Sequence, residues 1–117
     1  MFRHAIAFPR HLDFLDLPTP VEPLPGVNGV WIKRDDLTGK PYGGNKPRKL
    51  EFLLADALDQ NAQTIVTTGA TGSNHCLATT VYARRLGFNV HLIMFPQPET
   101  RVVRHHFAAV QALGASI

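Results

Sequence analysis

The sequence holds a single cysteine and no long apolar run, and each of these shortages excludes a class of protein. One cysteine cannot form a disulfide within the chain, which fits a reducing compartment, so we expect a cytoplasmic protein. No apolar stretch approaches the ~20 residues of a membrane-spanning helix, so we expect no membrane partner. The first ten residues also lack the apolar segment of a secretory signal.

A concentrated basic region is missing too. The 12 lysines and arginines exceed the 9 acidic residues only slightly, giving a net charge of +3, and they are scattered along the chain. The tightest cluster, Lys46, Arg48 and Lys49, is smaller than the basic stripe that nucleic-acid binding requires, so we expect no nucleic-acid partner. Neither Gly-x-Gly-x-x-Gly nor Gly-Lys-Ser/Thr occurs, which excludes the dinucleotide fingerprint and the P-loop.

The chain does contain enough apolar sequence for one folded domain. Its 117 residues are 44% hydrophobic, which excludes a disordered tail. A globule of this size buries roughly two-thirds of its unfolded surface. The last residues, 114–117, are typical of a turn into another strand, so we expect the chain to end within a fold.

Hydrophobic periodicity predicts strands that alternate with helices. The strands are expected at residues 30–33, 64–68 and 89–94, and the helices at 47–61, 73–86 and 99–113. Prolines crowd residues 1–29, which predicts an extended or irregular segment there. Such an alternation is typical of an α/β protein with a parallel sheet and right-handed connections.

Turns between a strand and a helix are candidate sites, because ligands of parallel α/β sheets bind where strands lead into helices. The first such turn holds Gly43, Gly44, Asn45 and Lys46, where the glycines let a ligand approach the backbone. Pro47 is expected in the first turn of the following helix, whose positive end favours the neutral lysine amine that a Schiff base requires. The alternative is a flexible loop with a solvated lysine.

The second candidate site is the turn at residues 68–75, which ends in Ser73, Asn74 and His75. The free N–H groups of a helix start, with the Ser73 hydroxyl and the Asn74 amide, would form a cradle for an anion or carboxylate. The alternative is that Ser73 simply caps the helix. His75 and Cys76 diverge by about 100° on a helix and cannot act as a base–nucleophile pair, so we expect Cys76 to be a small buried residue.

Two further pairs of polar residues favour structural interpretations. His105 and His106 have an unsuitable spacing for one metal and lack a third ligand, so we expect exposed histidines and no metal site. Asp35 and Asp36 would point to opposite sides of a strand, so we expect one exposed acid and one in a salt bridge.

Three blocks of sequence resemble one enzyme family. They are residues 32–38 (Ile-Lys-Arg-Asp-Asp-Leu-Thr), 43–51 (Gly-Gly-Asn-Lys-Pro-Arg-Lys-Leu-Glu) and 69–75 (Gly-Ala-Thr-Gly-Ser-Asn-His). In order and spacing they resemble the N-terminal part of the D-cysteine desulfhydrase / 1-aminocyclopropane-1-carboxylate deaminase family, pyridoxal-phosphate enzymes of the tryptophan-synthase-β type. The resemblance implies a parallel three-layer αβα fold of fold type II. Residues 1–62 would then belong to the larger cofactor domain, and residues 63–117 to a smaller βαβα domain.

The resemblance also implies roles for residues of both turns. Lys46, next to the cofactor-binding Asn45, corresponds to the lysine that forms the Schiff base with pyridoxal 5'-phosphate and moves protons at the substrate carbon. Asn74 corresponds to the asparagine that contacts the cofactor's ring hydroxyl oxygen. Ser73, the second expected catalytic residue, and His75 correspond to the loop that binds the carboxylate of a small amino-acid substrate. The expected products are ammonia and a 2-oxo acid, with sulfide from D-cysteine, and a completed fold is expected to form a homodimer.

Departures from the family pattern leave the substrate open. Leu77 stands where desulfhydrases often have arginine, and Gly72 replaces a common glutamine. Family members are several times longer, and their glycine-rich loop for the cofactor phosphate would lie beyond residue 117, which predicts weak cofactor binding by this chain alone. The alternatives are a 1-aminocyclopropane-1-carboxylate deaminase-like fragment, a non-catalytic α/β remnant, and a small-anion-binding module at the Ser73 helix start.

Overall fold

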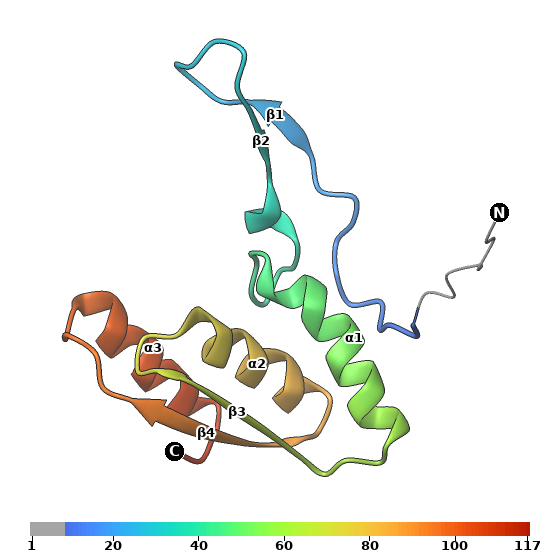
Figure 1. Ribbon diagram of the computed structural model, residues 1–117, viewed down its shortest axis with the longest axis vertical. Coiled ribbons are helices and arrows are strands. Elements are labelled where there is room, and N and C mark those ends of the chain that lie inside the picture. Colours follow the sequence, from blue (N-terminus) through green and yellow to red (C-terminus); the bar gives the residue numbers. More distant parts are fainter. Residues whose placement is uncertain (1–8) are drawn as a thin grey trace, which may run out of the picture.

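The computed structural model describes residues 9–117 and places an antiparallel arm beside a parallel α/β body (Figure 1). The elements in chain order are β1 (Val21–Pro23), β2 (Trp31–Lys33), the 3-10 turn η1 (Asp35–Leu37), α1 (Lys46–Asp59), β3 (Thr64–Ala70), α2 (Asn74–Arg85), β4 (Asn89–Phe95) and α3 (Arg101–Ala112). Within this described range, no helix has both the length and the apolar character to cross a membrane.

The body is built on the parallel pair of β3 and β4. The two strands run in register from Thr64 opposite Asn89, and α2 connects them. After α3, Ser116 forms a parallel bridge with His91. The parallel α/β class is therefore confirmed; after the predicted turn at residue 114, Ser116 pairs as a single bridge rather than as a full strand.

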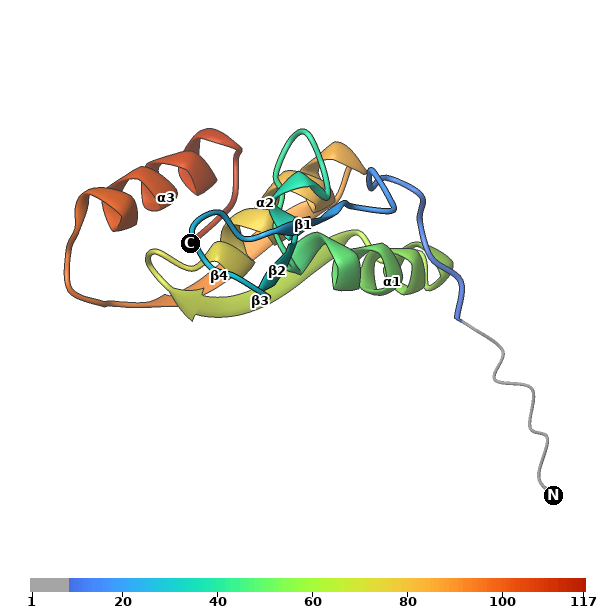
Figure 2. The ribbon, with the colours of Figure 1, turned by 90° about the horizontal axis from the view of Figure 1, so that it is seen from above.

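One face of the β3–β4 pair carries the core. Val90 and Leu92 point to this face and lie in the cluster of buried residues that α1, α2 and α3 contribute. Figure 2 shows α2 and α3 on the same side of the two strands. On the opposite face, Val66, Ile93 and Phe95 keep 61%, 66% and 56% of their surface exposed. The described chain thus supplies one helical layer of the α/β fold.

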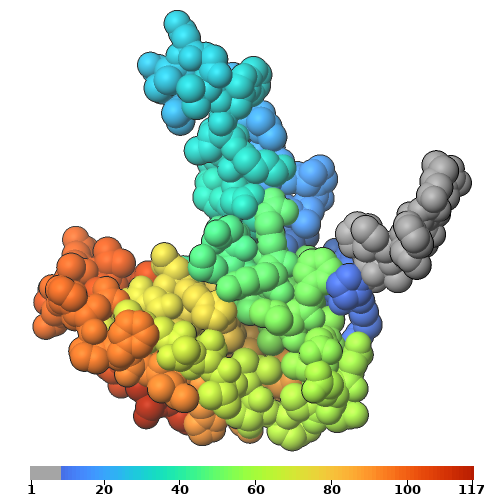
Figure 3. Space-filling model, viewed as in Figure 1, coloured from blue at the N-terminus to red at the C-terminus, as the bar shows by residue number. Residues whose placement is uncertain are grey.

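The strand predicted at residues 30–33 forms, but its expected place in the parallel sheet is wrong. β2 pairs antiparallel with β1, with Ile32 opposite Glu22, and the two form an arm that projects from the body (Figures 1 and 3). Pro23 is tolerated in β1 because no further strand needs its missing N–H. A three-residue strand has too little periodicity to reveal its partner, which long-range pairing decides.

The helix starts follow local capping signals. Ser73 caps α2 as predicted, since its Oγ accepts a hydrogen bond from the Cys76 N–H at 3.2 Å. Helix α3 begins at Arg101 rather than at residue 99, because Thr100 takes an extended conformation and its Oγ1 accepts from the Val103 N–H at 3.2 Å. Helix α1 begins at Lys46, with Pro47 in its first turn.

Candidate functional site

The two turns singled out in the sequence lie next to each other in space. Lys46 is the first residue of α1 and Asn74 is the first residue of α2. The Tyr42 hydroxyl, from the loop before α1, donates a hydrogen bond to Asn74 Oδ1 at 3.0 Å. The loop with the candidate Schiff-base lysine is thereby joined to the candidate carboxylate cradle.

The loop before Lys46 is held by backbone contacts. Gly43 passes so close to Asp36 that a Cβ at residue 43 would overlap the Asp36 carbonyl oxygen. Gly44 has a φ of +102°, which favours glycine, and its N–H donates to the Asp35 carbonyl at 2.6 Å. The buried Thr38 hydroxyl lies 2.8 Å from the Gly44 carbonyl oxygen. These contacts do not fit the alternative of a flexible loop.

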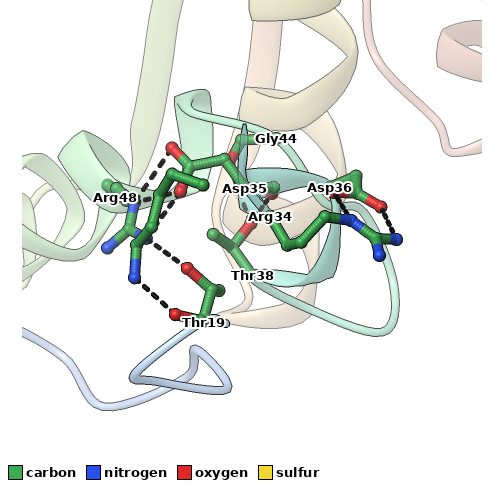
Figure 4. A network of polar contacts seen from close by, with 8 residues as sticks. Thr19, Arg34, Asp35, Asp36, Thr38, Gly44 and Arg48 are labelled. Atoms are coloured by element: carbon green, nitrogen blue, oxygen red, sulfur yellow. Dashed lines mark hydrogen bonds and ion pairs between the residues drawn. The ribbon is translucent and has the colours of Figure 1, made fainter. Parts of the chain in front are cut away.

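An ion-pair network anchors the same loop to α1. Arg48 Nη2 donates to Asp35 Oδ1 at 2.7 Å and to Thr19 Oγ1 at 3.1 Å (Figure 4). The hydrogen bonds from Arg48 hold the pKa of Asp35 below its usual value, so this carboxyl stays ionised at neutral pH. Asp36 pairs with Arg34 at 2.7 Å.

The expectation for the two acids is confirmed in part, since Asp36 is exposed and Asp35 lies in a salt bridge. Asp35 and Asp36 lie in the 3-10 turn η1, not in a strand, and both are paired with an arginine. Because each carboxylate is neutralised by a guanidinium, neither is poised as a general base. Their role in this structure is to shape the loop before Lys46.

The Lys46 amine has no acidic partner. Its side chain is half-buried, and Nζ donates to Asn45 Oδ1 at 3.2 Å. Among the described residues, no carboxylate lies within ion-pair distance of it. A primary amine is the group that can form a covalent bond with an aldehyde.

The start of α2 provides several hydrogen-bond donors together. The first-turn N–H groups of Asn74 and His75 have no partner within a helix. Ser73 keeps its hydroxyl proton for a ligand while its oxygen caps the helix. Ordinary capping and an anion cradle are therefore compatible at this turn.

The imidazole of His75 faces the protein interior. Its Nε2 lies 2.9 Å from Thr67 Oγ1 on β3, and its Nδ1 is buried without a hydrogen-bond partner in the described chain. Burial, with smaller contributions from the positive charges of Lys49 and Lys46, lowers the pKa of His75. His75 therefore stays neutral at pH 7 and offers the cradle its backbone N–H.

Gly72 is fixed by residues of the segment that follows β4. Its N–H donates to Gln97 Oε1 at 3.1 Å, and His106 Nδ1 lies 2.9 Å from its carbonyl oxygen. The expectation of two exposed histidines is thus wrong for His106, which is half-buried, and confirmed for His105. Because Gly72 is held by these two contacts, the position of the next residue, Ser73, which caps helix α2, is held as well.

Two smaller expectations can be compared with the structure. Cys76 is fully buried on α2, which confirms the interpretation of a small core residue. Across residues 9–117 no three His, Cys, Asp or Glu side chains are grouped so as to hold a metal ion. A hollow of about 800 Å³ lies between α2 and α3, and Tyr42 lines it while Lys46 and Asn74 do not.

The replacement of Gly72 by alanine tests how tightly this turn is packed. The new Cβ would lie 2.8 Å from Val103 Cγ2 and 3.2 Å from Gln97 Nε2, closer than ordinary contacts. We expect Gly72→Ala to lower the free energy of unfolding by about 1–3 kcal/mol, measured by urea denaturation. In the Val103→Ala background the loss is expected to shrink, because the smaller side chain makes room. Equal losses in both backgrounds would contradict this packing.

Comparison with known proteins identifies the family. A family model described as "Pyridoxal-phosphate dependent enzyme" matches residues 12–117. The chain belongs to the pyridoxal-phosphate-dependent enzyme family.

Several relatives show which members of the pyridoxal-phosphate family this chain resembles. This chain is 50% identical over 97 residues to the bifunctional D-cysteine desulfhydrase/1-aminocyclopropane-1-carboxylate deaminase of Arabidopsis thaliana mitochondria, covering 78% of this chain and 24% of the relative. It is 48% identical over 91 residues to the D-cysteine desulfhydrase of Salmonella typhimurium, covering 74% of this chain and 27% of the relative. The crystal structure of an ACC deaminase homologue matches with a TM-score of 0.81 and 35% identity, over 92% of this chain and 34% of that chain.

The chain corresponds to only a part of each of these relatives. It spans 24–34% of the length of the three pyridoxal-phosphate family relatives just named. The resemblance noted in the sequence is therefore confirmed at the level of the family and of the α/β fold.

The sequence analysis missed three residues that contact the two turns. Tyr42, Gln97 and His106 contact the two turns from loops and from α3, with partners 25 to 34 residues away in the chain. Tyr42 could have been noticed as a hydroxyl beside the glycine pair. Nothing local pointed to Gln97 or His106, whose role depends on how α3 packs.

Proposed function

We propose that this chain carries the cofactor-binding lysine and the substrate carboxylate loop of a pyridoxal-phosphate-dependent lyase or deaminase acting on small amino acids. The reaction would resemble that of D-cysteine desulfhydrases and release ammonia and a 2-oxo acid. The observation that carries the proposal is the contact between Tyr42 and Asn74, which brings the Lys46 loop against the Ser73 turn. The names of the relatives support the class of substrate.

The residues present fit pyridoxal phosphate. Lys46 offers a primary amine that has no carboxylate partner among residues 9–117, and Asn74 offers an exposed carboxamide joined by Tyr42 to the loop before Lys46. When bound, the cofactor supplies an electron sink for a carbanion at the substrate carbon. Lys46 would hold the cofactor aldehyde and move the proton at that carbon, and Asn74 would donate to the ring oxygen. Ser73, with the first-turn N–H groups of α2, would orient the substrate carboxylate.

Two further parts of the proposal concern the setting of the enzyme. We place it in the cytoplasm because a single buried cysteine suits a reducing compartment.

For the completed fold we propose a homodimer. The apolar face formed by Val66, Ile93 and Phe95 would be covered in a longer chain, since surfaces of this kind rarely stay exposed in monomers.

The proposal is tested by trapping the cofactor on the chain. The 117-residue protein is incubated with pyridoxal phosphate, reduced with borohydride, and mapped by peptide mass spectrometry. We expect the label on Lys46 in preference to Lys49 by about tenfold or more, because Lys49 is exposed and lacks the neighbouring donors. Lys46→Arg is expected to abolish the preferred label while keeping the charge.

Lys49→Arg is the matched control, one turn along the same helix, and it should leave the label on Lys46 unchanged. Equal labelling of Lys46 and Lys49 would contradict the assignment of Lys46. Release of 2-oxo acid from D-cysteine or from 1-aminocyclopropane-1-carboxylate, compared in parallel, would then distinguish the two substrate classes. A chain that captures the cofactor but releases no 2-oxo acid would support the non-catalytic alternative.

A further inference from the structure

Tyr42 makes the only side-chain hydrogen bond between the two candidate turns in the described part of the chain. Its hydroxyl donates to Asn74 Oδ1 at 3.0 Å, across 32 residues of sequence. Neither Lys46, which bonds to its neighbour Asn45, nor Ser73, which bonds to the Cys76 N–H, reaches the other turn in this way. The position of the Asn74 carboxamide therefore depends on Tyr42.

The backbone of Tyr42 is itself held from the core. The Tyr82 hydroxyl donates to the Tyr42 carbonyl oxygen at 2.7 Å. Tyr82 is only 3% exposed and stacks on Phe14, with ring centroids 4.5 Å apart. Gly39 packs directly against the same hydroxyl, leaving no room for a side chain. Tyr42 is thus a rigid bridge: α2 fixes its main chain and its side chain reaches the first residue of that helix.

The direction of the hydrogen bond decides what Asn74 can offer a ligand. A carboxamide has one acceptor oxygen and two N–H donors, and rotation by 180° exchanges them. Because the Tyr42 hydroxyl donates to Oδ1, the oxygen is occupied and the Nδ2 hydrogens are left as donors. Burial raises the pKa of Tyr42, so the phenol remains a donor throughout the neutral range.

We propose that Tyr42 is a positioning residue that orients the Asn74 carboxamide, so that its N–H groups face the anionic ring oxygen of bound pyridoxal phosphate. This inference rests on the proposed function for the identity of the ligand, whereas the orientation of Asn74 exists in the ligand-free chain. Among the hydrogen bonds of the described residues, the Tyr42 hydroxyl bonds to Asn74 and not to Lys46, so its expected action is through Asn74.

The test uses Tyr42→Phe, which removes the hydroxyl oxygen and keeps the ring. In the free chain, the side-chain amide signals of Asn74 in a ¹⁵N-edited NMR spectrum report its orientation. We expect two well-separated proton shifts in the natural protein and a collapse of that separation in Tyr42→Phe. The affinity for pyridoxal phosphate is expected to fall about five- to tenfold, the effect of one neutral hydrogen bond.

A double-mutant cycle separates positioning from a general structural role. In the Asn74→Ala background, Tyr42→Phe should cause no further loss of affinity, because the residue through which it acts is gone. Tyr82→Phe is the control for stability, since it removes the bond beneath Tyr42 and leaves the Tyr42 hydroxyl in place. It should lower the urea midpoint with less effect on affinity than Tyr42→Phe has.

The outcomes distinguish this inference from the proposed function. With 3-deoxypyridoxal phosphate, which lacks the ring oxygen, Tyr42→Phe should cost no affinity, and an equal loss would overturn the assignment of that oxygen. An unchanged Asn74 amide signal in Tyr42→Phe, or an equal affinity loss with and without Asn74, would overturn the positioning role. If Lys46 captures no cofactor in the natural protein, the proposed function fails while the NMR result still decides whether Tyr42 orients Asn74.

Discussion

Replacing Gly43 with alanine is expected to destabilise the protein by about 3 kcal/mol or more, at the upper end of the costs of overpacking. The added Cβ would overlap the Asp36 carbonyl oxygen and lie 2.8 Å from the Asp36 carbonyl carbon. Both are backbone atoms of η1, which the Arg48–Asp35 ion pair fixes, so they cannot move aside as a flexible side chain would. Urea unfolding measures the loss directly.

Gly44→Ala is the matched control for this prediction. At residue 44 an added Cβ meets no atom within 4 Å, but the φ of +102° is unfavourable for alanine. Its cost is therefore conformational, about 1–2 kcal/mol. If Gly43→Ala were no less stable than Gly44→Ala, the close approach to Asp36 would be contradicted.

The same pair of variants connects the loop to the proposed chemistry. Gly43 lies three residues before Lys46, so a displaced loop would shift the Lys46 amine from its place at the start of α1. We expect borohydride-trapped label on Lys46 to fall in Gly43→Ala even at temperatures where the variant is folded. Near-attack geometry is sensitive to displacements of about 1 Å, which explains the large effect expected from a small shift.

The parts of the site that could be predicted from the sequence are those with local signals. Pro47 after a glycine-rich turn indicated the start of α1, and Ser73 indicated the start of α2. Capping and backbone preference act within a few residues, so each signal is readable without knowing the fold. The parallel direction of the two strands in the body followed from the alternation of strands and helices.

The parts that could not be predicted depend on contacts between distant segments. The Tyr42–Asn74 and His106–Gly72 hydrogen bonds join residues 32 and 34 positions apart. The pairing of β2 with β1 likewise depends on where the arm folds, and not on the composition of the strands. A pattern of apolar residues identifies which face is buried but carries no information about which polar groups meet across the core.

The buried position of Glu51 is another feature that could not be predicted from the sequence. In the sequence it is an acid near the positive end of a helix, a position usually exposed. In the structure it is only 5% exposed, and its Oε1 accepts hydrogen bonds from the Phe14 and Leu15 N–H groups at 3.0 and 3.2 Å. The carboxylate thus attaches the N-terminal segment to α1.

Glu51→Ala is therefore expected to be strongly destabilising. It leaves two N–H groups without an acceptor, each at a cost of about 1–3 kcal/mol, and adds a cavity. The sum approaches the whole stability of a small domain, about 5–15 kcal/mol, so we expect much of the protein to unfold at 37 °C. Glu51→Gln keeps an acceptor oxygen at the same place and should recover at least half of the loss. Asp13→Ala, at an exposed acid, should stay within about 0.5 kcal/mol of the natural protein.

Hydrogen exchange at low temperature locates the damage caused by Glu51→Ala. The N-terminal segment also reaches the Lys46 loop, because the Asp16 N–H donates to the Thr38 carbonyl at 2.9 Å and the Thr38 hydroxyl contacts Gly44. We expect the amides of residues 12–16 and of Gly44 to lose protection before those of α2 and β4 do. Uniform loss across the chain would mean that Glu51 supports the whole core, whereas unchanged protection at residues 14 and 15 would contradict its role as their acceptor. In the expected case the segment detaches first, and the loop before Lys46 loosens as a consequence.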